Sequence, residues 1–229
     1  KNGIKMSKSK GNVVSPDALV NDYGCDSLRM YELFVGPPEL DAEWDDRGID
    51  GVNRFLKRLW NLLMDSKEAD VQPTKEMIKL RHKMVYDITN RLESFSLNTV
   101  ISGFMEYNNK FIEMAKKEGG IDKETLETIA VLLSPFAPHF AEEMWEQLGH
   151  GETIFKAGWP SYDESAMKDD EIEVPVQING KTRAVISISA DASKDEAIAA
   201  GKEAVADKLT GTIVKEIYVP KKIINIVQK

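Results

Sequence analysis

Two lysines and two serines stand close together near the start of the chain, in a pattern suited to binding phosphate groups. They are Lys5, Ser7, Lys8 and Ser9. A lysine presents a compact positive charge with three hydrogen-bond donors on a long, flexible stem. Gly11 follows, and a glycine lets such a loop change its backbone conformation as charge develops on a ligand. The pattern predicts a polyphosphate-binding loop, although short lysine- and serine-rich stretches are also common in solvated loops.

A longer stretch around these residues carries a family resemblance. It runs Lys5-Met6-Ser7-Lys8-Ser9-Lys10-Gly11-Asn12-Val13-Val14-Ser15-Pro16. This string resembles the second signature of class I aminoacyl-tRNA synthetases, a loop that closes over ATP. The segments that follow resemble leucyl-tRNA synthetases of bacterial type, namely residues 23–29, 34–39, 43–51 and 54–60. Isoleucyl and valyl enzymes resemble the first part only, and a non-catalytic helical RNA-binding module that retains the loop is a further alternative.

The resemblance assigns roles to the loop residues. It implies that Lys8 contacts the ATP phosphates as pyrophosphate leaves, that Lys5 helps to hold the loop or the phosphates, and that Ser7 and Ser9 complete the ATP-binding loop. It also implies leucine, ATP with Mg²⁺, and tRNA(Leu) as ligands of the parent enzyme. The other class I signature, the leucine pocket and the editing domain are missing, and the chain begins at Lys1. We therefore expect a C-terminal fragment that is inactive alone and has no cofactor bound.

Composition sets the broad class of the protein. The chain has 229 residues, of which 42% are hydrophobic, and this length predicts two folding units. No stretch approaches the roughly 18 consecutive apolar residues of a membrane span, so we expect a soluble, cytoplasmic protein. We also expect a monomer. The net charge of -8 argues against non-specific nucleic-acid binding. Acidic residues concentrate between positions 121 and 172, whereas lysine and arginine outnumber acid from Glu173 onward.

Cysteine and histidine usage argues against a metal site. Cys25 is the only cysteine, which excludes an internal disulfide and a zinc site built on paired thiolates. We expect its side chain to be a small buried one. The three histidines, His82, His139 and His150, are not spaced as metal ligands, and we interpret His139 as a structural residue at a helix start.

Helix signals dominate the first two thirds of the chain. Ser15 as a cap and Pro16 as a first residue predict a helix that ends at Gly24, and Asp26 is expected to cap the next one. Apolar residues at helical spacing then predict helices over about 48–63, 77–92, 97–112 and 122–133, and Pro135 and Pro138 interrupt the last of these before a further segment at 140–148. Thr74 or a neighbour is expected to cap the second helix, and Asp122 to open the fourth. We expect an antiparallel bundle of the class I anticodon-binding type over 37–167, with 1–36 as the end of the catalytic region.

The last part of the chain changes to a strand pattern. After an acidic linker at 168–171, apolar residues alternate at period two on either side of Asn179-Gly180, which predicts a β-hairpin. Ser193 and Glu196 form a capping box for a helix, and two more strands follow around Pro220. This β-β-α-β-β pattern over 172–229 resembles the small C-terminal, tRNA-binding domain of bacterial leucyl-tRNA synthetases. The predicted fold is therefore multidomain, with an α-helical unit and an α+β unit.

Two groups of cations are candidates for tRNA contact. Lys181 and Arg183 flank the predicted hairpin turn, and we expect Lys221 and Lys222 to join them in one patch. The second group lies on the polar face of the helix that begins near residue 48, and consists of Arg54, Lys57 and Arg58. Such side chains neutralise phosphates, although most exposed lysines are simply solvated.

Overall fold

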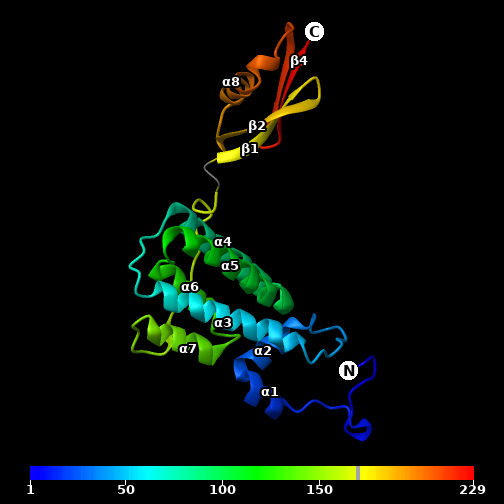
Figure 1. The fold of residues 1–229 in the computed structure, drawn as a ribbon, viewed down its shortest axis with the longest axis vertical. Helices are drawn as coiled ribbons and strands as arrows, with labels where there is room; N and C mark the ends of the chain where they lie inside the picture. Colours follow the sequence, from blue (N-terminus) through cyan, green and yellow to red (C-terminus); the bar gives the residue numbers. More distant parts are fainter. Residues whose placement is uncertain (169–170) are drawn as a thin grey trace. The chain divides into compact units, whose positions relative to one another are not determined.

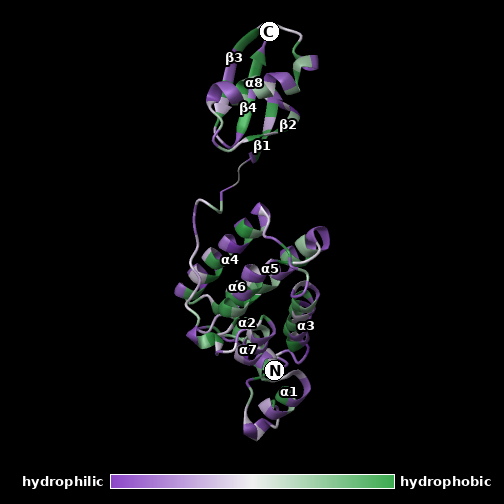
Figure 2. Ribbon diagram, turned by 90° about the vertical axis from the view of Figure 1, so that its left-hand side faces the viewer, coloured by the Kyte–Doolittle hydropathy of each residue, from purple (hydrophilic) through white to green (hydrophobic). Residues whose placement is uncertain are grey.

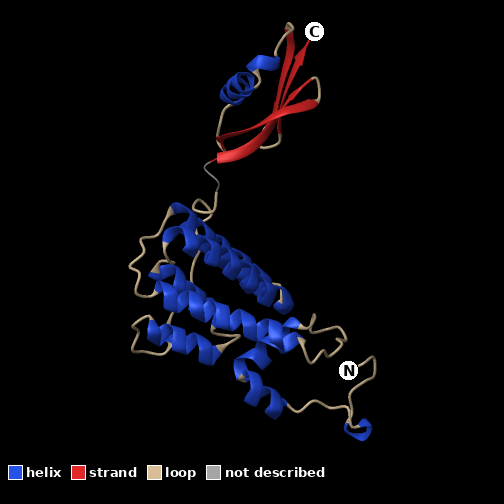
Figure 3. Cartoon of the chain, viewed as in Figure 1, coloured by secondary structure: helices blue, strands red, loops and turns tan. Residues whose placement is uncertain are grey.

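The computed structural model describes residues 1–168 and 171–229. The chain forms two compact units, residues 1–167 and 168–229. The first is helical and the second is α+β (Figures 1 and 3). The predicted acidic linker includes Asp169 and Asp170, which lie outside the described residues. Within the described ranges, no helix is both long enough and apolar enough to cross a membrane.

The first unit is built from amphipathic helices and short 3-10 turns. They are η1 (Lys8–Lys10), α1 (Pro16–Tyr23), α2 (Cys25–Phe34), α3 (Gly48–Ser66), α4 (Lys75–Glu93), α5 (Leu97–Glu118), α6 (Lys123–Leu133), α7 (Pro138–Gln147) and η2 (Ile154–Lys156). Helix α3 buries Ile49, Val52 and Leu59 completely or almost so, and hydrophobic and hydrophilic positions alternate around it (Figure 2). The helices are therefore held by one continuous apolar core.

Two of the helix caps expected from the sequence are confirmed and one is not. The hydroxyl of Thr74 accepts from Met77 N at 3.2 Å, and Asp122 Oδ1 accepts from Thr125 N at 3.0 Å, as predicted. The prediction for Ser15 is wrong. Ser15 occupies the N-cap position of α1, but its hydroxyl makes no capping bond and instead donates weakly to Asp17. The proline at the first helical position is the remaining start signal there.

Asp26 does not cap α2, as the sequence had suggested, but the N-terminus of α7. Its Oδ2 accepts from Phe140 N at 2.6 Å, and its Oδ1 lies 2.9 Å from His139 Nδ1. The N-cap position of α7 is Ala137, which has no side-chain acceptor. A carboxylate from another helix therefore satisfies the first-turn donors of α7, where the helix dipole also favours negative charge.

The prediction that Cys25 is buried is also wrong. Cys25 is the first residue of α2 and its side chain is exposed. The buried side of α2 consists of Asp26, Ser27, Met30 and Tyr31, so the first residue of the helix faces outward.

The second unit is a mixed four-stranded sheet with one helix. Its elements are β1 (Glu171–Ile178), β2 (Lys181–Ser189), α8 (Lys194–Ala204), η3 (Ala206–Lys208), β3 (Ile213–Val219) and β4 (Ile223–Gln228). The strand order is β2-β1-β4-β3, in which β1 and β4 are parallel and the other pairs antiparallel. Val174, Val176, Ile224 and Ile226 are buried together with Ala197 of α8.

Two local features shape this unit. Asn179 and Gly180 have φ values of 49° and 79°, which suits the two-residue turn predicted between β1 and β2. The capping box at α8 is confirmed, because Ser193 Oγ accepts from Glu196 N at 3.3 Å while Glu196 Oε2 accepts from Ser193 N at 2.8 Å.

Removing a real cap and an apparent one should have different effects. Thr74→Ala removes the hydroxyl that caps α4 and should lower the free energy of unfolding of the helical unit by about 1 kcal/mol. Ser15→Ala removes no capping bond and should change it by less than about 0.5 kcal/mol. Urea unfolding followed by tryptophan fluorescence reads this unit alone, since all four tryptophans lie before residue 168. Equal losses in the two variants would contradict the assignment of the caps.

The start of α8 should be acid-sensitive. The pKa of Glu196 is lowered because its carboxylate accepts from the backbone N–H and the hydroxyl of Ser193. The resulting stabilisation is present above the unfolded glutamate pKa of about 4.3 and is lost as pH falls through the lower folded value. Amide-hydrogen exchange of α8, corrected for intrinsic rates, should lose more protection below pH ~4 in the wild type than in Glu196→Gln. The same acid response in both proteins would contradict this.

Candidate phosphate loop and nucleic-acid surfaces

Residues 5–11, which we call the lysine-serine loop, contain a single 3-10 turn closed by a left-handed glycine. Lys10 N donates to Ser7 O at 3.1 Å, and Gly11 N donates to Lys8 O at 3.2 Å. Gly11 has φ 65°, a conformation that glycine adopts without strain. The turn thus presents residues 7–10 on a short, tight curve.

Asn12 fixes this turn from its far side, a role that the sequence reasoning missed. Its Oδ1 accepts from Ser7 N at 2.9 Å, and its Nδ2 donates to Lys5 O at 3.4 Å. One side-chain amide therefore joins both sides of the loop. The available signal was an asparagine directly after the glycine, because asparagine side chains often bond to nearby backbone groups.

The predicted phosphate-binding residues are accessible on this turn. The side chains of Lys5, Lys8 and Ser9 are exposed and that of Ser7 is half-buried. The hydroxyl oxygens of Ser7 and Ser9 lie 3.2 Å apart. Neither Lys5 nor Lys8 forms an ion pair with another residue that the structure describes, so both ammonium groups can meet an anionic ligand.

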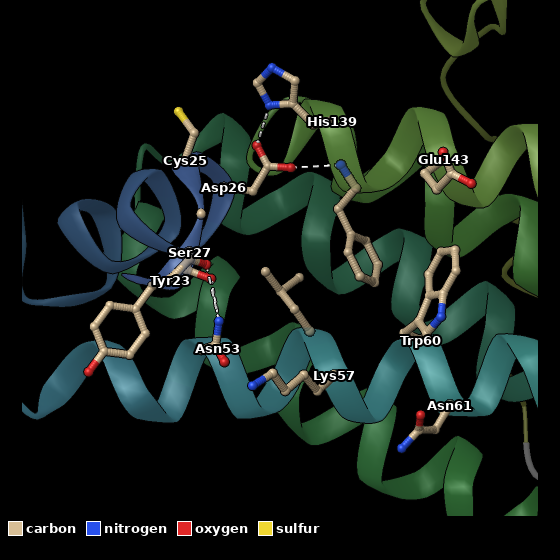
Figure 4. Close-up of a pocket in the computed structure, with 13 residues that line it drawn as sticks. Tyr23, Cys25, Asp26, Ser27, Asn53, Lys57, Trp60, Asn61, His139 and Glu143 are labelled. Atoms are coloured by element: carbon tan, nitrogen blue, oxygen red, sulfur yellow. Dashed lines mark hydrogen bonds and ion pairs between the residues drawn. The ribbon is translucent and has the colours of Figure 1, made fainter. Parts of the chain in front are cut away.

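A cavity of about 740 Å³ lies between α2, α3 and α7 (Figure 4). Leu56, Trp60 and Phe140 line it together with polar residues, among them Lys57 and His139. Asp26 lies between the His139 ring and the backbone N–H of Phe140, as described above (Figure 4).

The structure places two of the three predicted cations of α3 along cavities. Arg54, Lys57 and Arg58 are all accessible, and none forms an ion pair with another described residue. Lys57 lines the 740 Å³ cavity, and Arg58 lines a second cavity of about 460 Å³ that Lys116 of α5 also lines. These cations therefore form an accessible ridge that could contact a polyanion.

The four cations predicted as one patch in the second unit do not lie together. In the parallel register Ile178 pairs with Ile226, and Asn179 N donates to Ile226 O at 3.0 Å. The turn that precedes Lys181 and Arg183 therefore lies at the carboxyl end of β4. Lys221 and Lys222 precede the first residue of β4, at the other end of the sheet, about 20 Å away at roughly 3.3 Å per residue. The expected patch is divided.

Lys208 lies at the end of the sheet that holds Lys181 and Arg183. Lys208 Nζ donates to Arg183 O at 3.2 Å, and Lys208 O accepts from Gln228 Nε2 at 3.3 Å. Gln228 in turn bonds to Asn179 through its backbone N at 2.9 Å. We call Lys181, Arg183 and Lys208 the turn-end cations. Lys208 was missed because only the parallel pairing of β1 and β4 brings it there.

Comparisons with known proteins match this chain over its whole length. A family model described as the anticodon-binding domain of tRNA ligase matches residues 74–198, more than half of the chain, and one for class I tRNA synthetases (I, L, M and V) matches residues 1–45. The leucine–tRNA ligase of Fervidobacterium nodosum is 47% identical, and that of Thermosipho melanesiensis 45% identical. Each alignment covers 100% of this chain and 30% of the relative, so the chain spans less than a third of their length.

A solved structure shows the same similarity. It is the ternary complex of the leucyl-tRNA synthetase of Agrobacterium radiobacter K84 with tRNA and LeuAMS, which superposes with a TM-score of 0.80 at 27% identity. The superposition covers 100% of this chain and 32% of that one. The resemblance to leucyl-tRNA synthetases inferred from the sequence is confirmed, and the chain belongs to the family of anticodon-binding domains of tRNA ligases.

Proposed function

We propose that this chain is part of a leucine–tRNA ligase, which activates leucine with ATP and transfers it to tRNA(Leu). The observation that carries the proposal is the similarity to leucine–tRNA ligases along the entire chain, from the lysine-serine loop to β4. The same relatives disfavour the isoleucyl and valyl alternatives. The chain supplies the ATP-phosphate loop and surfaces for tRNA, and is inactive without the rest of a cytoplasmic, monomeric ligase.

The finer architecture is part of this proposal. Residues 1–36 are the end of the catalytic region, 37–167 are an antiparallel anticodon-binding-type bundle, and 172–229 are a small β-β-α-β-β domain that binds tRNA. The order of elements in the second unit supports its place in this division. Met30 and Tyr31 of α2 share one apolar core with the bundle, so the boundary at residue 36 rests on the family resemblance and not on packing.

Lys8 acts on the charge that develops as pyrophosphate leaves. A pair of unit charges about 4 Å apart interacts by roughly 4 kcal/mol at an effective dielectric of about 20. Much of this interaction already exists with bound ATP, and only the part that grows toward the transition state accelerates adenylate formation. Lys5, Ser7 and Ser9 hold the loop or the phosphates beside it.

Magnesium enters only as the ion that ATP carries on its phosphates. No group of three or more His, Cys, Asp and Glu side chains within residues 1–168 and 171–229 is arranged to hold a metal ion. The charged groups of the loop are ammonium groups, which suit the phosphates and repel a metal ion, and its serine hydroxyls can bond to phosphate oxygens. The residues of this loop therefore act on the phosphates.

Replacement of Lys8 should lower turnover more than ATP affinity. In the full-length ligase that contains this chain, Lys8→Ala should reduce kcat of leucine-dependent ATP–pyrophosphate exchange by about 100-fold, as when other donors to a transition state are removed. The matched control is Lys10→Ala, an exposed lysine on the same turn, which should stay within about threefold of the wild type. A normal exchange rate with weaker ATP binding in Lys8→Ala would show that this role is wrong.

We assign tRNA binding by the second unit to the turn-end cations. Lys181, Arg183 and Lys208 converge on one end of the sheet through the contacts described above. Acidic residues, in contrast, concentrate between positions 121 and 172. Because phosphate neutralisation dominates the affinity for nucleic acids, converging cations favour binding where dispersed ones do not.

Binding of tRNA(Leu) to this chain at several salt concentrations tests the assignment. Lys181→Ala, Arg183→Ala and Lys208→Ala should each weaken binding and reduce the salt slope by about one for each phosphate that the variant no longer neutralises. Lys221→Ala/Lys222→Ala is the matched control at the other end of the sheet and should leave the slope unchanged.

The α3 cations provide the competing outcome. If the turn-end variants bind normally and the triple variant Arg54→Ala/Lys57→Ala/Arg58→Ala loses the salt dependence, the tRNA-binding surface lies on α3. If the Lys221→Ala/Lys222→Ala control weakens binding as much as the turn-end variants, no single end of the sheet forms the site.

A further inference from the structure

The segment between α2 and α3 lies beside the residues that lead into the lysine-serine loop (Figure 1). Glu43 Oε1 accepts from Gly3 N at 3.1 Å, and Asp46 Oδ2 pairs with Lys1 Nζ at 2.6 Å. Residues 1–4 form a turn of their own, in which Ile4 N donates to Lys1 O at 3.1 Å. Two carboxylates from a distant part of the sequence thus attach the leading end of the loop.

This segment is itself attached to the core of the helical unit. The Trp44 ring packs edge-to-face on the Tyr31 ring at 5.1 Å, and Tyr31 is only 3% exposed. The Tyr31 hydroxyl donates to Asp45 O at 2.7 Å, and Trp44 Nε1 donates to Asp46 Oδ1 at 2.8 Å. Gly48 completes the corner, because a Cβ at this position would overlap the Tyr31 ring and hydroxyl. The segment that carries Glu43 and Asp46 is therefore held in place by its contacts with Tyr31.

The trailing end of the loop is attached to the same region. Helix α1 follows the loop, and the carbonyl of its last residue, Tyr23, accepts from Asn53 Nδ2 on α3 at 3.1 Å. Asn53 also donates to Ser27 Oγ at 3.1 Å. Residues 43–53 therefore hold the chain both before and after the loop, which projects between the two attachments.

We propose that Glu43 and Asp46 are positioning residues for the lysine-serine loop, which hold its leading end so that Lys5 and Lys8 face the ATP phosphates in one orientation. Neither residue touches a ligand in this proposal. Glu43 acts as a hydrogen-bond acceptor for a neutral backbone N–H, so its charge is dispensable. Asp46 acts as the partner of an ammonium group, so its charge is required. The catalytic consequence rests on the function proposed above, whereas the positioning of the loop does not.

Limited trypsin digestion of this chain tests the positioning alone. Trypsin cleaves after lysine, and the loop offers Lys5, Lys8 and Lys10. Cleavage of a folded protein follows the population of locally opened states when opening is fast. Glu43→Ala removes one hydrogen bond and should raise cleavage in the loop about fivefold, whereas Glu43→Gln keeps the acceptor and should stay within about twofold of the wild type. Mass spectrometry of early digests assigns the cleaved bonds.

Two further variants sharpen this test. Asp46→Asn should increase cleavage although it can still accept from Trp44 Nε1, because the neutral amide cannot form the ion pair with Lys1. Asp46→Ala removes both contacts and should increase cleavage at least as much. The matched control is Glu39→Ala, an exposed glutamate before the same segment that has no polar contact with another described residue. Wild-type cleavage in Glu43→Ala, or equal acceleration in Glu43→Gln and Glu39→Ala, would overturn the proposal.

Pyrophosphate exchange in the full-length ligase tests the catalytic consequence. Glu43→Ala should lower kcat by about fivefold with the KM for ATP within about twofold, and Glu43→Gln should restore kcat. An unchanged kcat in Glu43→Ala, despite faster cleavage of the loop, would overturn the catalytic part of the proposal. If Lys8→Ala itself leaves exchange unchanged, the proposed function fails instead, and the trypsin experiment still decides whether Glu43 positions the loop.

Discussion

The contact between the Asp26 carboxylate and the first turn of α7 is the interaction on which the surroundings of the loop most depend. Asp26 is only 8% exposed, and a buried carboxylate is tolerated only when it is hydrogen-bonded or paired. The first turn of α7 needs an acceptor that its own sequence lacks at Ala137. Separation of α2 from α7 would leave both groups unsatisfied, so the two helices are held together by a mutual requirement.

This contact connects the loop to the core in a few steps. Phe140, whose N–H meets Asp26, packs edge-to-face against Trp60 of α3 with ring centroids 5.8 Å apart. Arg29, one turn further along α2, donates to Pro135 O at 3.1 Å. Helix α2 is thereby fixed to α3 and to the entry of α7, and α1 and the loop precede it directly in the chain. The loop can be exposed because the helices behind it are attached at several points.

The sequence predicted the elements whose causes are local. Thr74, Asp122 and the Ser193–Glu196 box cap their helices as expected, and Asn179-Gly180 turns the chain between β1 and β2. In each case the acceptor and the donor lie within a few residues of each other. Such pairs form in the same way whatever the rest of the fold does.

Two predictions were wrong because the structure brings together groups that are far apart in the sequence. Asp26 is at a position where a local cap on α2 is plausible. Its carboxylate instead accepts a hydrogen bond from Phe140 N in α7. The expectation that Lys221 and Lys222 share one patch with Lys181 and Arg183 is wrong for a related reason, because the parallel pairing of β1 and β4 puts the two pairs at opposite ends of the sheet. Both outcomes depend on contacts between parts of the chain that are far apart in sequence.

The loop must be held in place while its lysines stay unpaired, and the structure separates these two tasks. The groups that hold the loop bond to its backbone or to residues before it, as Asn12 does at Ser7 N and Glu43 at Gly3 N. A carboxylate placed on Lys8 would hold the loop as well, but the ATP that we propose as ligand would then have to displace a charge-assisted bond. Attachment through backbone groups avoids this competition. The positive charge of the loop is thus fixed in position by neighbours that do not neutralise it.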